Sequence, residues 1–274
     1  MTAYEFEKYI KLIRNGKRIE AEILREKDIP DVLIKHFYLK EDDSDEKKFY
    51  TLENNMLWFS AISKLNDPYE FKGMVVNEKA FKEKGYPDNV IDYFKEFLRM
   101  EEYGVVCLSG RTVDYLPMWA YYTNNYHGFC VEYEVVNKPC IHKVQYEKKR
   151  IPIASLFFQL KEALSENIRN GKKSSPEAES IASLIRQNLY IKGESWAHEQ
   201  EYRIAMPIDN IVGKNYEIST FGLRAKRIIA GVNCSEANIN RLNHISNIIG
   251  CGNIFISYLS NEKYGMEIER LLEK

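Results

Sequence analysis

The helical stretch in the middle of the chain is the feature that most constrains its fold. From Ile153 to about Lys192, apolar residues recur at helical spacing in two pieces, separated by the polar loop Asn170–Pro176. Segments rich in β-branched and aromatic residues, which are typical of strands, stand on both sides of it. They cover about residues 33–39, 56–60, 104–109, 129–135, 141–146, 201–207, 225–232 and 253–259. Because the helical stretch splits one series of strands, we predict an α+β fold with a mixed or antiparallel central sheet and a helical insertion at about 153–192.

The N-terminal segment is expected to lie outside that domain. Residues of about 3–27 alternate apolar and charged positions at helical spacing, and Pro30 ends the run. We therefore divide the chain into an N-terminal helical extension, residues 1–30, and a single domain, residues 31–274. Within the domain, the strand at 141–146 is expected to pair with the one at 129–135. Helices are expected at about 78–102, 117–125 and 236–249, and a short helix is expected to close the chain.

Charge and cysteine usage limit the function classes. With a formal net charge of −1, the 274 residues do not form a strongly basic protein of the kind that binds polyanions over its whole surface, although a local basic patch is compatible with it. No apolar run approaches ~18 residues and no signal pattern opens the chain, which predicts a cytoplasmic protein without a membrane partner. The five cysteines form no CxxC pair. We interpret them as structural thiols and expect no metal site.

The segment Trp196–Arg203, WAHEQEYR, is the strongest candidate for chemistry. The motifs of P-loop nucleotide hydrolases, zinc proteases and α/β-hydrolases are absent from the sequence. On a strand, Glu199, Glu201 and Arg203 would share one face, with the carboxylates about 6–7 Å apart. Carboxylates at that spacing repel, so one of them needs a cation, a hydrogen bond or a raised pKa, and Arg203 can supply the cation. The alternative is a solvated strand end whose Glu–Arg pair is worth about 0–1 kcal/mol.

Other candidates stand alone in the sequence, and each has a structural alternative. His36 lies among apolar residues, where a satisfied core histidine is the commoner outcome. Ser60 ends an apolar segment and either binds a ligand or terminates a strand. Tyr121 and Tyr126 lie near the turn at Gly128 and either stack on a planar ligand or pack in the core. Asp67 belongs to an Asn-Asp-Pro turn.

Three longer motifs together resemble a widespread bacterial family known as domain of unknown function 2971. They are LWFSAISKLNDPYEF (57–71), VCLSGRTVDYLPMWAYYTNNYHGFCVEYE (106–134) and WAHEQEYRI (196–204). The resemblance covers about residues 32–258, in the expected order, and leaves the N-terminal helix outside. It departs from the expected pattern in KHFY (35–38), where a Tyr-Lys-Tyr or His-Tyr type sequence is usual. Membership would not by itself define an activity.

The order of elements also resembles, more weakly, ADP-ribosyltransferases of the diphtheria-toxin and DNA-modifying kinds. His36 on the first strand, Ser60 after an aromatic residue and Glu201 at the start of a later strand would occupy that family's positions, and Glu199-x-Glu201 is similar to the Glu-x-Glu pair of its arginine-specific members. The resemblance implies NAD as the substrate and Glu201, supported by Glu199, as the group that stabilises the oxocarbenium-like transition state. The NAD-binding residues it implies are His36, Ser60, Tyr121, Tyr126 and Arg203. It also implies a toxin or anti-phage effector that modifies a protein or nucleic acid.

Two other functions remain open at this point. One is a non-catalytic sensor or interaction module that works with a partner protein from the same locus. The other is a nuclease with Glu199, Glu201 and Asp67 around Mg²⁺, for which the sequence offers carboxylates but no recognisable ligand set.

Overall fold

A mixed nine-stranded sheet runs through the computed structural model, which describes residues 3–100, 102–211 and 216–271. The strand order is β15–β14–β13–β6–β1–β5–β11–β7, and β3 pairs with β5 beside this path. All neighbours are antiparallel except β13 and β14, which are parallel. The strands are β1 (Val32–Phe37), β3 (Ser60–Ala61), β5 (Tyr103–Ser109), β6 (Phe129–Val135), β7 (His142–Lys143), β11 (Glu201–Pro207), β13 (Leu223–Ala230), β14 (Phe255–Leu259) and β15 (Met266–Arg270). The α+β prediction is confirmed.

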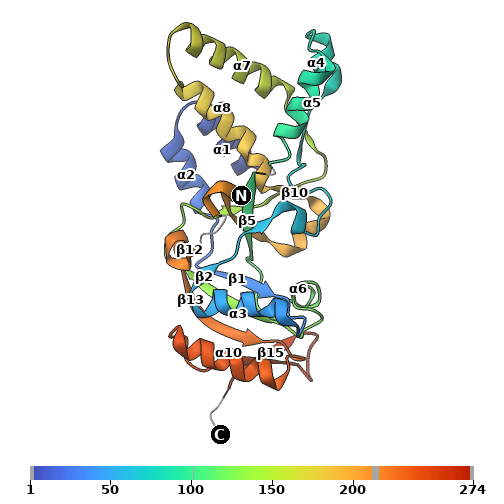
Figure 1. Ribbon diagram of the computed structural model, residues 1–274, viewed down its shortest axis with the longest axis vertical. Coiled ribbons are helices and arrows are strands. Elements are labelled where there is room, and N and C mark those ends of the chain that lie inside the picture. Colours follow the sequence, from blue (N-terminus) through green and yellow to red (C-terminus); the bar gives the residue numbers. More distant parts are fainter. Residues whose placement is uncertain (1–2, 101, 212–215, 272–274) are drawn as a thin grey trace.

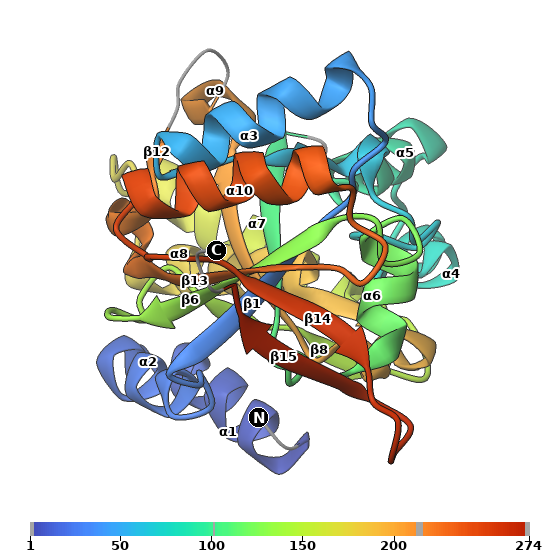
Figure 2. The same cartoon turned by 90° about the horizontal axis from the view of Figure 1, so that it is seen from below.

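Helices cover the sheet in two groups (Figure 1). The helices α3 (Glu46–Glu53) and α10 (Glu236–Ile248) lie side by side over the sheet, where their apolar residues join the main core (Figure 2). The second group gathers at the other end of the molecule. It consists of α1 (Ala3–Arg14), α2 (Arg18–Glu26), α4 (Glu78–Glu83), α5 (Asp88–Phe97), α7 (Ala154–Arg169) and α8 (Pro176–Arg186). Two short helices, α6 (Leu116–Tyr122) and α9 (Ile208–Ile211), complete the set among the described residues.

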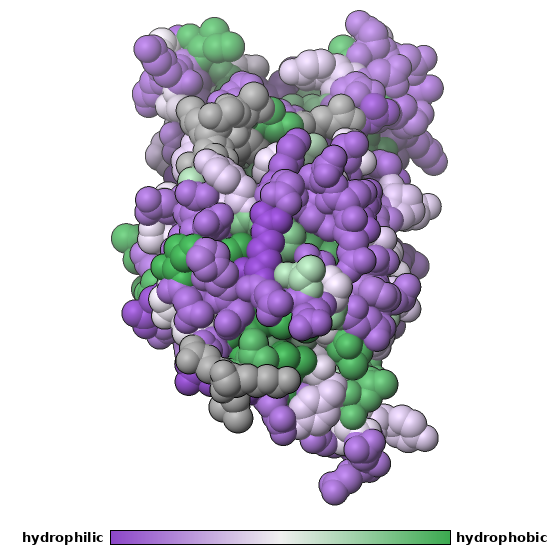
Figure 3. All heavy atoms as spheres, turned by 60° about the horizontal axis from the view of Figure 1, so that its bottom comes forward, coloured by the Kyte–Doolittle hydropathy of each residue, from purple (hydrophilic) through white to green (hydrophobic). Residues whose placement is uncertain are grey.

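Among the described residues, three short strand pairs lie outside the central sheet. These are β10 (Ile191–Gly193) with β8 (Gln145–Glu147), β12 (Tyr216–Glu217) with β2 (Met56–Leu57), and β4 (Met74–Val75) with β9 (Ile151–Pro152). The first and third of these pack in the core of the second group of helices, whereas β12 and β2 pack in the main core, where β2 contacts α3. Within the part of the chain that is described, no helix has the length and apolar character needed to span a bilayer. The face seen in Figure 3 is covered mainly by hydrophilic residues, with apolar residues in separate smaller patches.

The N-terminal helices pack against the helical insertion rather than standing apart from it. Tyr9, Ile13 and Ala21 are buried in the same apolar cluster as Ile181 and Leu184 of α8. The predicted single run over 3–27 is wrong in detail, because Gly16, at φ +71°, breaks it into α1 and α2. A chain reversal at this point lets both helices contact the insertion. The boundary at residue 30 stays a prediction.

Three other expectations about the elements are wrong. The C-terminal segment Met266–Arg270 is a strand, β15, because its apolar and charged residues alternate and pair with β14. The segment 141–146 divides into β7 and part of β8, which pair with β11 and β10 and not with β6. The segment 56–60 likewise divides between β2 and β3, which belong to different sheets. Local composition identified strand segments at 56–60 and 141–146 but not at 266–270, and in all three cases the pairing depends on residues far away in the sequence.

The sheet has an opening along one edge of β5. Strand β1 pairs with β5 at Ile34 and Ser109, and β3 pairs with the same edge at Val105 and Gly104. Four residues of an extended strand span about 13 Å, so a gap separates β1 from β3 along β5. On the other edge of β5, Glu201 is opposite Ser109. The opening therefore places residues of β1 and β3 near the start of β11.

Candidate functional site

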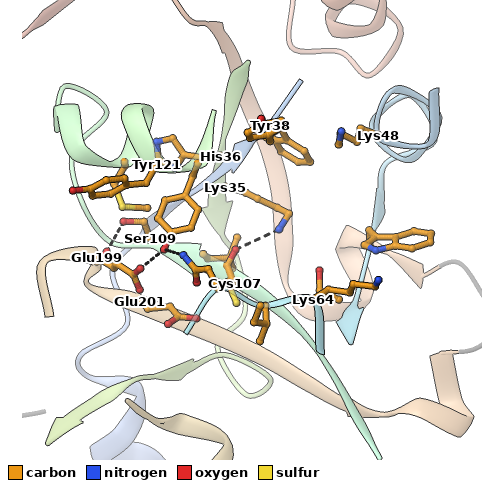
Figure 4. A pocket seen from close by; sticks show the side chains of 18 of the residues that line it. Lys35, His36, Tyr38, Lys48, Lys64, Cys107, Ser109, Tyr121, Glu199 and Glu201 are labelled. Atoms are coloured by element: carbon orange, nitrogen blue, oxygen red, sulfur yellow. Dashed lines mark hydrogen bonds between the residues drawn. The ribbon is translucent and has the colours of Figure 1, made fainter. Parts of the chain in front are cut away.

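A pocket of about 620 Å³ occupies this opening. Figure 4 shows His36 and Tyr121 beside Glu199 at one end, and Lys48 and Lys64 at the other. Several segments far apart in the sequence contribute to the walls. The lining residues with chemically active side chains are Lys35, His36, Lys40, Lys47, Lys48, Ser60, Lys64, Glu70, Cys107, Ser109, Tyr121, Tyr122, Lys192, Glu199 and Glu201.

At the first end, three carboxylates surround the ammonium group of Lys192. The Nζ atom lies 2.8 Å from Glu199 Oε2, 3.2 Å from Glu201 Oε2 and 3.2 Å from Glu70 Oε1. All four side chains are buried. Lys192 also lies 4.8 Å from the centre of the Trp196 ring. Burial disfavours the charged form of Lys192, but the three carboxylates outweigh it and raise its pKa. Lys192 is therefore held as a cation at the centre of the carboxylates.

Arg203 supplies a second cation behind this group. Its guanidinium donates to both carboxylate oxygens of Glu201, at 2.6 and 2.9 Å, and to Glu70 at 2.9 Å. A further hydrogen bond of 3.0 Å reaches the Leu189 carbonyl. The planar guanidinium suits this fork-like arrangement, which a lysine cannot reproduce. Arg203 is completely buried and does not line the pocket, so its role is to position the two glutamates.

The same charges separate the pKa values of Glu70 and Glu201. Burial alone would raise the pKa of Glu201, but the charge and hydrogen bonds of Arg203 and the charge of Lys192 lower it to about 2. Burial dominates for Glu70 and raises its pKa, because Arg203 and Lys192 compensate less there and Glu201 repels it. Two carboxyl groups with pKa values displaced in opposite directions are typical of acid–base sites.

The backbone before β11 brings Glu199 and Glu201 together. Glu199 ends the 3₁₀-helix η4 (Glu194–Glu199), and Gln200 adopts the left-handed conformation at φ +48°. The expectation that Glu199 lies on a strand is therefore wrong, whereas Glu201 and Arg203 do share a strand face. The Ser109 hydroxyl donates to the Glu199 carbonyl at 2.7 Å, which fixes the bend against β5. The expected alternative of an exposed ion pair is also wrong, since Glu201 and Arg203 are buried.

The two glutamates differ in the hydrogen bonds that they can still accept. Glu201 receives hydrogen bonds from Arg203 at both oxygens, from Lys192 at 3.2 Å and from the Cys107 thiol. A carboxylate offers about four lone-pair positions, so this set occupies them. Glu199 receives one from Lys192 and one from the Tyr122 hydroxyl, which in turn accepts from Asn66 at 3.1 Å. Glu199 is therefore the carboxylate with acceptor capacity left for a ligand.

His36 lies in the same pocket with both ring nitrogens lacking a hydrogen-bond partner in the described structure. Its ring contacts Trp119 edge-on, with 5.5 Å between centroids. Burial, assisted by the charge of Lys35, lowers the pKa of His36 to about 3, so the ring is neutral at pH 7. A neutral imidazole offers one donor and one acceptor. The expected outcome of a satisfied core histidine does not fit a buried ring with two unused polar atoms.

The structure brings most of the predicted site residues to this pocket and leaves others outside. His36, Ser60, Tyr121, Glu199 and Glu201 all line it. Two residues predicted to bind NAD do not line it. Tyr126 packs in an apolar cluster with its hydroxyl 3.4 Å from the Leu116 carbonyl, and Arg203 stands behind Glu201.

The carboxylate set proposed for a nuclease does not form. The Asp67 side chain accepts from the backbone N–H of Tyr69 at 2.8 Å, as the Asn-Asp-Pro turn predicts. Lys192 occupies the space between Glu199 and Glu201. Across residues 3–100, 102–211 and 216–271, no group of three or more His, Cys, Asp or Glu side chains is placed to hold a metal ion.

The sequence interpretation did not single out three residues of this pocket, Glu70, Lys35 and Lys192. Glu70 is the final acidic residue of the NDPYE motif, and its position there was a signal that could have identified it. Lys35 and Lys192 carry no local signal, because an isolated lysine in a sequence is far more often a solvated surface residue. Only their burial beside the carboxylates and Cys107 distinguishes them.

Two partly buried histidines predict that mild acid destabilises the fold. Burial lowers the pKa of His36 and of His142, which stacks on Tyr190, to about 3. The unfolded chain binds a proton on each histidine near pH 6.5 and the folded chain does not, so stability is complete above this pH and falls as the pH drops toward 3. We expect the free energy of urea unfolding to fall by up to about 4 kcal/mol from pH 7 to pH 5. His142→Gln should remove about half of this dependence, and an unchanged slope would contradict the assignment.

Comparison with known proteins gives a family match over part of the chain. No curated protein and no solved structure matches the sequence, and the resemblance to ADP-ribosyltransferases receives no support from these comparisons. One family model matches, over a shorter range than the expected 32–258. The matched range begins in α6 and ends in β11, so it contains Tyr122, Lys192, Glu199 and Glu201 but not His36. Residues 118–204 of this chain match the family described as Protein of unknown function (DUF2971).

Proposed function

We propose that this protein cleaves the bond between nicotinamide and ribose in NAD, as an ADP-ribosyltransferase or an NAD glycohydrolase. The observation that carries the proposal is the convergence of His36, Ser60, Tyr121 and Glu199, from four distant segments, on one 620 Å³ pocket. Pockets of this size accommodate ligands of a few hundred daltons and more.

Charge at the carboxylate end suits the leaving group. Three carboxyl groups, those of Glu70, Glu199 and Glu201, face two cations, Lys192 and Arg203. The nicotinamide ring of NAD is a cation, and its charge passes to the ribose as the bond breaks. An excess of buried negative charge therefore favours this part of the substrate and the transition state. Tyr121, which is 64 % exposed at the pocket wall, presents a ring on which nicotinamide would stack.

The reaction would proceed through an oxocarbenium-like ribose. The electron pair of the C1′–N bond leaves with nicotinamide, which becomes neutral. Glu199 accepts a hydrogen bond from a ribose hydroxyl and stabilises the developing charge more strongly than it stabilises the ground state. Water or an acceptor then adds at C1′ and loses a proton. Glu70, the carboxyl group whose pKa burial raises, is the best suited of the three to receive that proton.

Nicotinamide release from NAD tests the proposal. We expect the purified protein, supplied with NAD and a cell lysate as a source of acceptors, to release nicotinamide in an amount that increases with protein concentration. Tyr121→Leu should raise KM about tenfold, because it removes a stacking surface worth roughly 1–1.5 kcal/mol. Tyr126→Phe, outside the pocket, is the matched control and should leave KM unchanged. Binding of NAD without release would instead support a non-catalytic module, and neither binding nor release would reject the NAD site altogether.

A further inference from the structure

The end of the pocket away from Glu199 is lined by lysines. Six lysines and three glutamates line the pocket, and all three glutamates contact Lys192. The other five come from β1, from the segment before and within α3, and from the 3₁₀-helix Ile62–Lys64. They are Lys35, Lys40, Lys47, Lys48 and Lys64, of which Figure 4 labels Lys35, Lys48 and Lys64. In a chain with a formal net charge of −1, this is a local concentration of positive charge.

Lys35 distinguishes this group from ordinary surface lysines. Its side chain enters the pocket from β1, and its Nζ makes one long hydrogen bond, 3.5 Å to the Cys107 carbonyl. The ammonium also lies 5.5 Å from the Phe37 ring centre. Among the described residues, no carboxylate lies within ion-pair distance of it. An ammonium has three donors, and a partly buried one with a single long hydrogen bond and no ion pair is costly to keep charged. Burial accordingly lowers the pKa of Lys35.

The neighbouring lysines leave positive charge available at the same end. Lys48 is fixed by an ion pair of 2.6 Å with Asp45, whose other oxygen accepts from two backbone N–H groups. In the described part of the chain, the side chains of Lys40, Lys47 and Lys64 have no such partner. A solvated lysine needs no partner, but Lys40, Lys47 and Lys64, together with the ion-paired Lys48, line a cavity that also contains the partly buried, under-satisfied ammonium of Lys35, and this concentration of positive charge suits an anion.

We propose that Lys35 and the lysines around it bind the diphosphate group of a nucleotide. That this nucleotide is NAD rests on the proposed function, whereas the anion site rests on the lysines alone. The diphosphate of NAD is joined to the nicotinamide ribose by one methylene group. A substrate whose ribose contacts Glu199 would therefore extend its diphosphate into the adjacent part of the same pocket. The cationic and anionic parts of NAD would meet the acidic and basic ends of the pocket, respectively.

Calorimetric titration with inorganic pyrophosphate, ADP and adenosine tests the site without depending on catalysis. Wild-type protein should bind pyrophosphate and ADP, more weakly as salt increases, and should bind adenosine at least tenfold more weakly than ADP. Lys35→Met should weaken pyrophosphate binding by about 10- to 100-fold, the value of one charge-assisted hydrogen bond. Lys79→Met is the matched control, because Lys79 is 86 % exposed on α4 and away from the pocket; it should leave binding unchanged.

Thermal unfolding separates a loss of binding from a loss of structure. Lys35→Met replaces a partly buried charge with an apolar chain of similar length, so its melting temperature should equal or exceed that of the wild type. Pyrophosphate binding unaffected by Lys35→Met would overturn the proposal, as would a short single-stranded oligonucleotide that binds more tightly than ADP. Pyrophosphate binding that depends on Lys35 in a protein that does not cleave NAD would support the anion site and reject the proposed function. NAD cleavage without pyrophosphate binding would support the proposed function and reject the anion site.

Discussion

Glu199→Gln is expected to lower the rate of NAD cleavage by about 10²- to 10³-fold while the protein stays folded. The amide keeps the size of the carboxylate and can still accept from Tyr122, but it removes the negative charge that would face the ribose. Because the loss concerns the transition state, we expect kcat to fall and KM to change little. The measurement is nicotinamide release under saturating NAD, together with the melting temperature of both proteins.

Glu194→Gln provides the matched control for this change. Glu194 begins the same 3₁₀-helix, and its ion pair with Lys148 at 3.7 Å is exposed. The same chemical substitution at this position should leave kcat unchanged. If Glu199→Gln retains full activity and Glu201→Gln loses it without unfolding, the substrate-contacting role returns to Glu201, as the sequence resemblance implied.

A cellular experiment addresses the effector role that the resemblance implies. If the protein is a toxin or anti-phage effector that consumes NAD, its induced expression in bacteria should lower cellular NAD and slow growth. Expression of Glu199→Gln at the same level should do neither. Equal growth inhibition by both proteins would show that the toxicity does not depend on Glu199.

Arg203→Met is expected to reduce the free energy of unfolding by about 3–5 kcal/mol. The side chain is completely buried and joins Glu201 to Glu70, so its removal leaves two buried carboxylates with Lys192 as their remaining cation. Removing one ion of a buried pair lowers the free energy of unfolding by far more than the intact pair contributed to it, because the remaining ion stays buried without its partner. Urea unfolding at pH 7, fitted for the free energy and its slope, measures the change.

An exposed arginine and a second substitution control this experiment. Arg224→Met removes the same group from an exposed pair with Glu134 and should cost less than about 1 kcal/mol. Adding Glu70→Gln to Arg203→Met should recover part of the loss, because one of the stranded charges disappears. A cost of under about 1 kcal/mol for Arg203→Met, or a double variant less stable than additivity predicts, would show that the charge group is not coupled as described.

Predictions that depend on neighbouring residues mostly agreed with the structure, whereas the predicted strand pairing, which depends on contacts between distant segments, did not. Strands such as Gly104–Ser109 and Phe129–Val135 were predictable because their own side chains bury on a pleated surface. The end of the chain was not, since Met266–Arg270 is a strand only through its pairing with β14. His36, Ser60 and Glu199 could each be named as candidates from their local sequence, but their common location depends on the opening between β1 and β3.

By itself, the sequence WAHEQEYR determined that Glu201 and Arg203 share one face of a strand, because side chains alternate with a period of two. The helical and strand periodicities of the whole sequence also determined the α+β class. Only the tertiary structure decided that this strand start is buried and that Glu199, after the turn at Gln200, contacts Lys192 together with Glu201 and Glu70. It also decided that Lys35 lines the same pocket. The reason is that a charge acquires its chemical character from the solvent it loses and the partners it gains, and both come from segments distant in the chain.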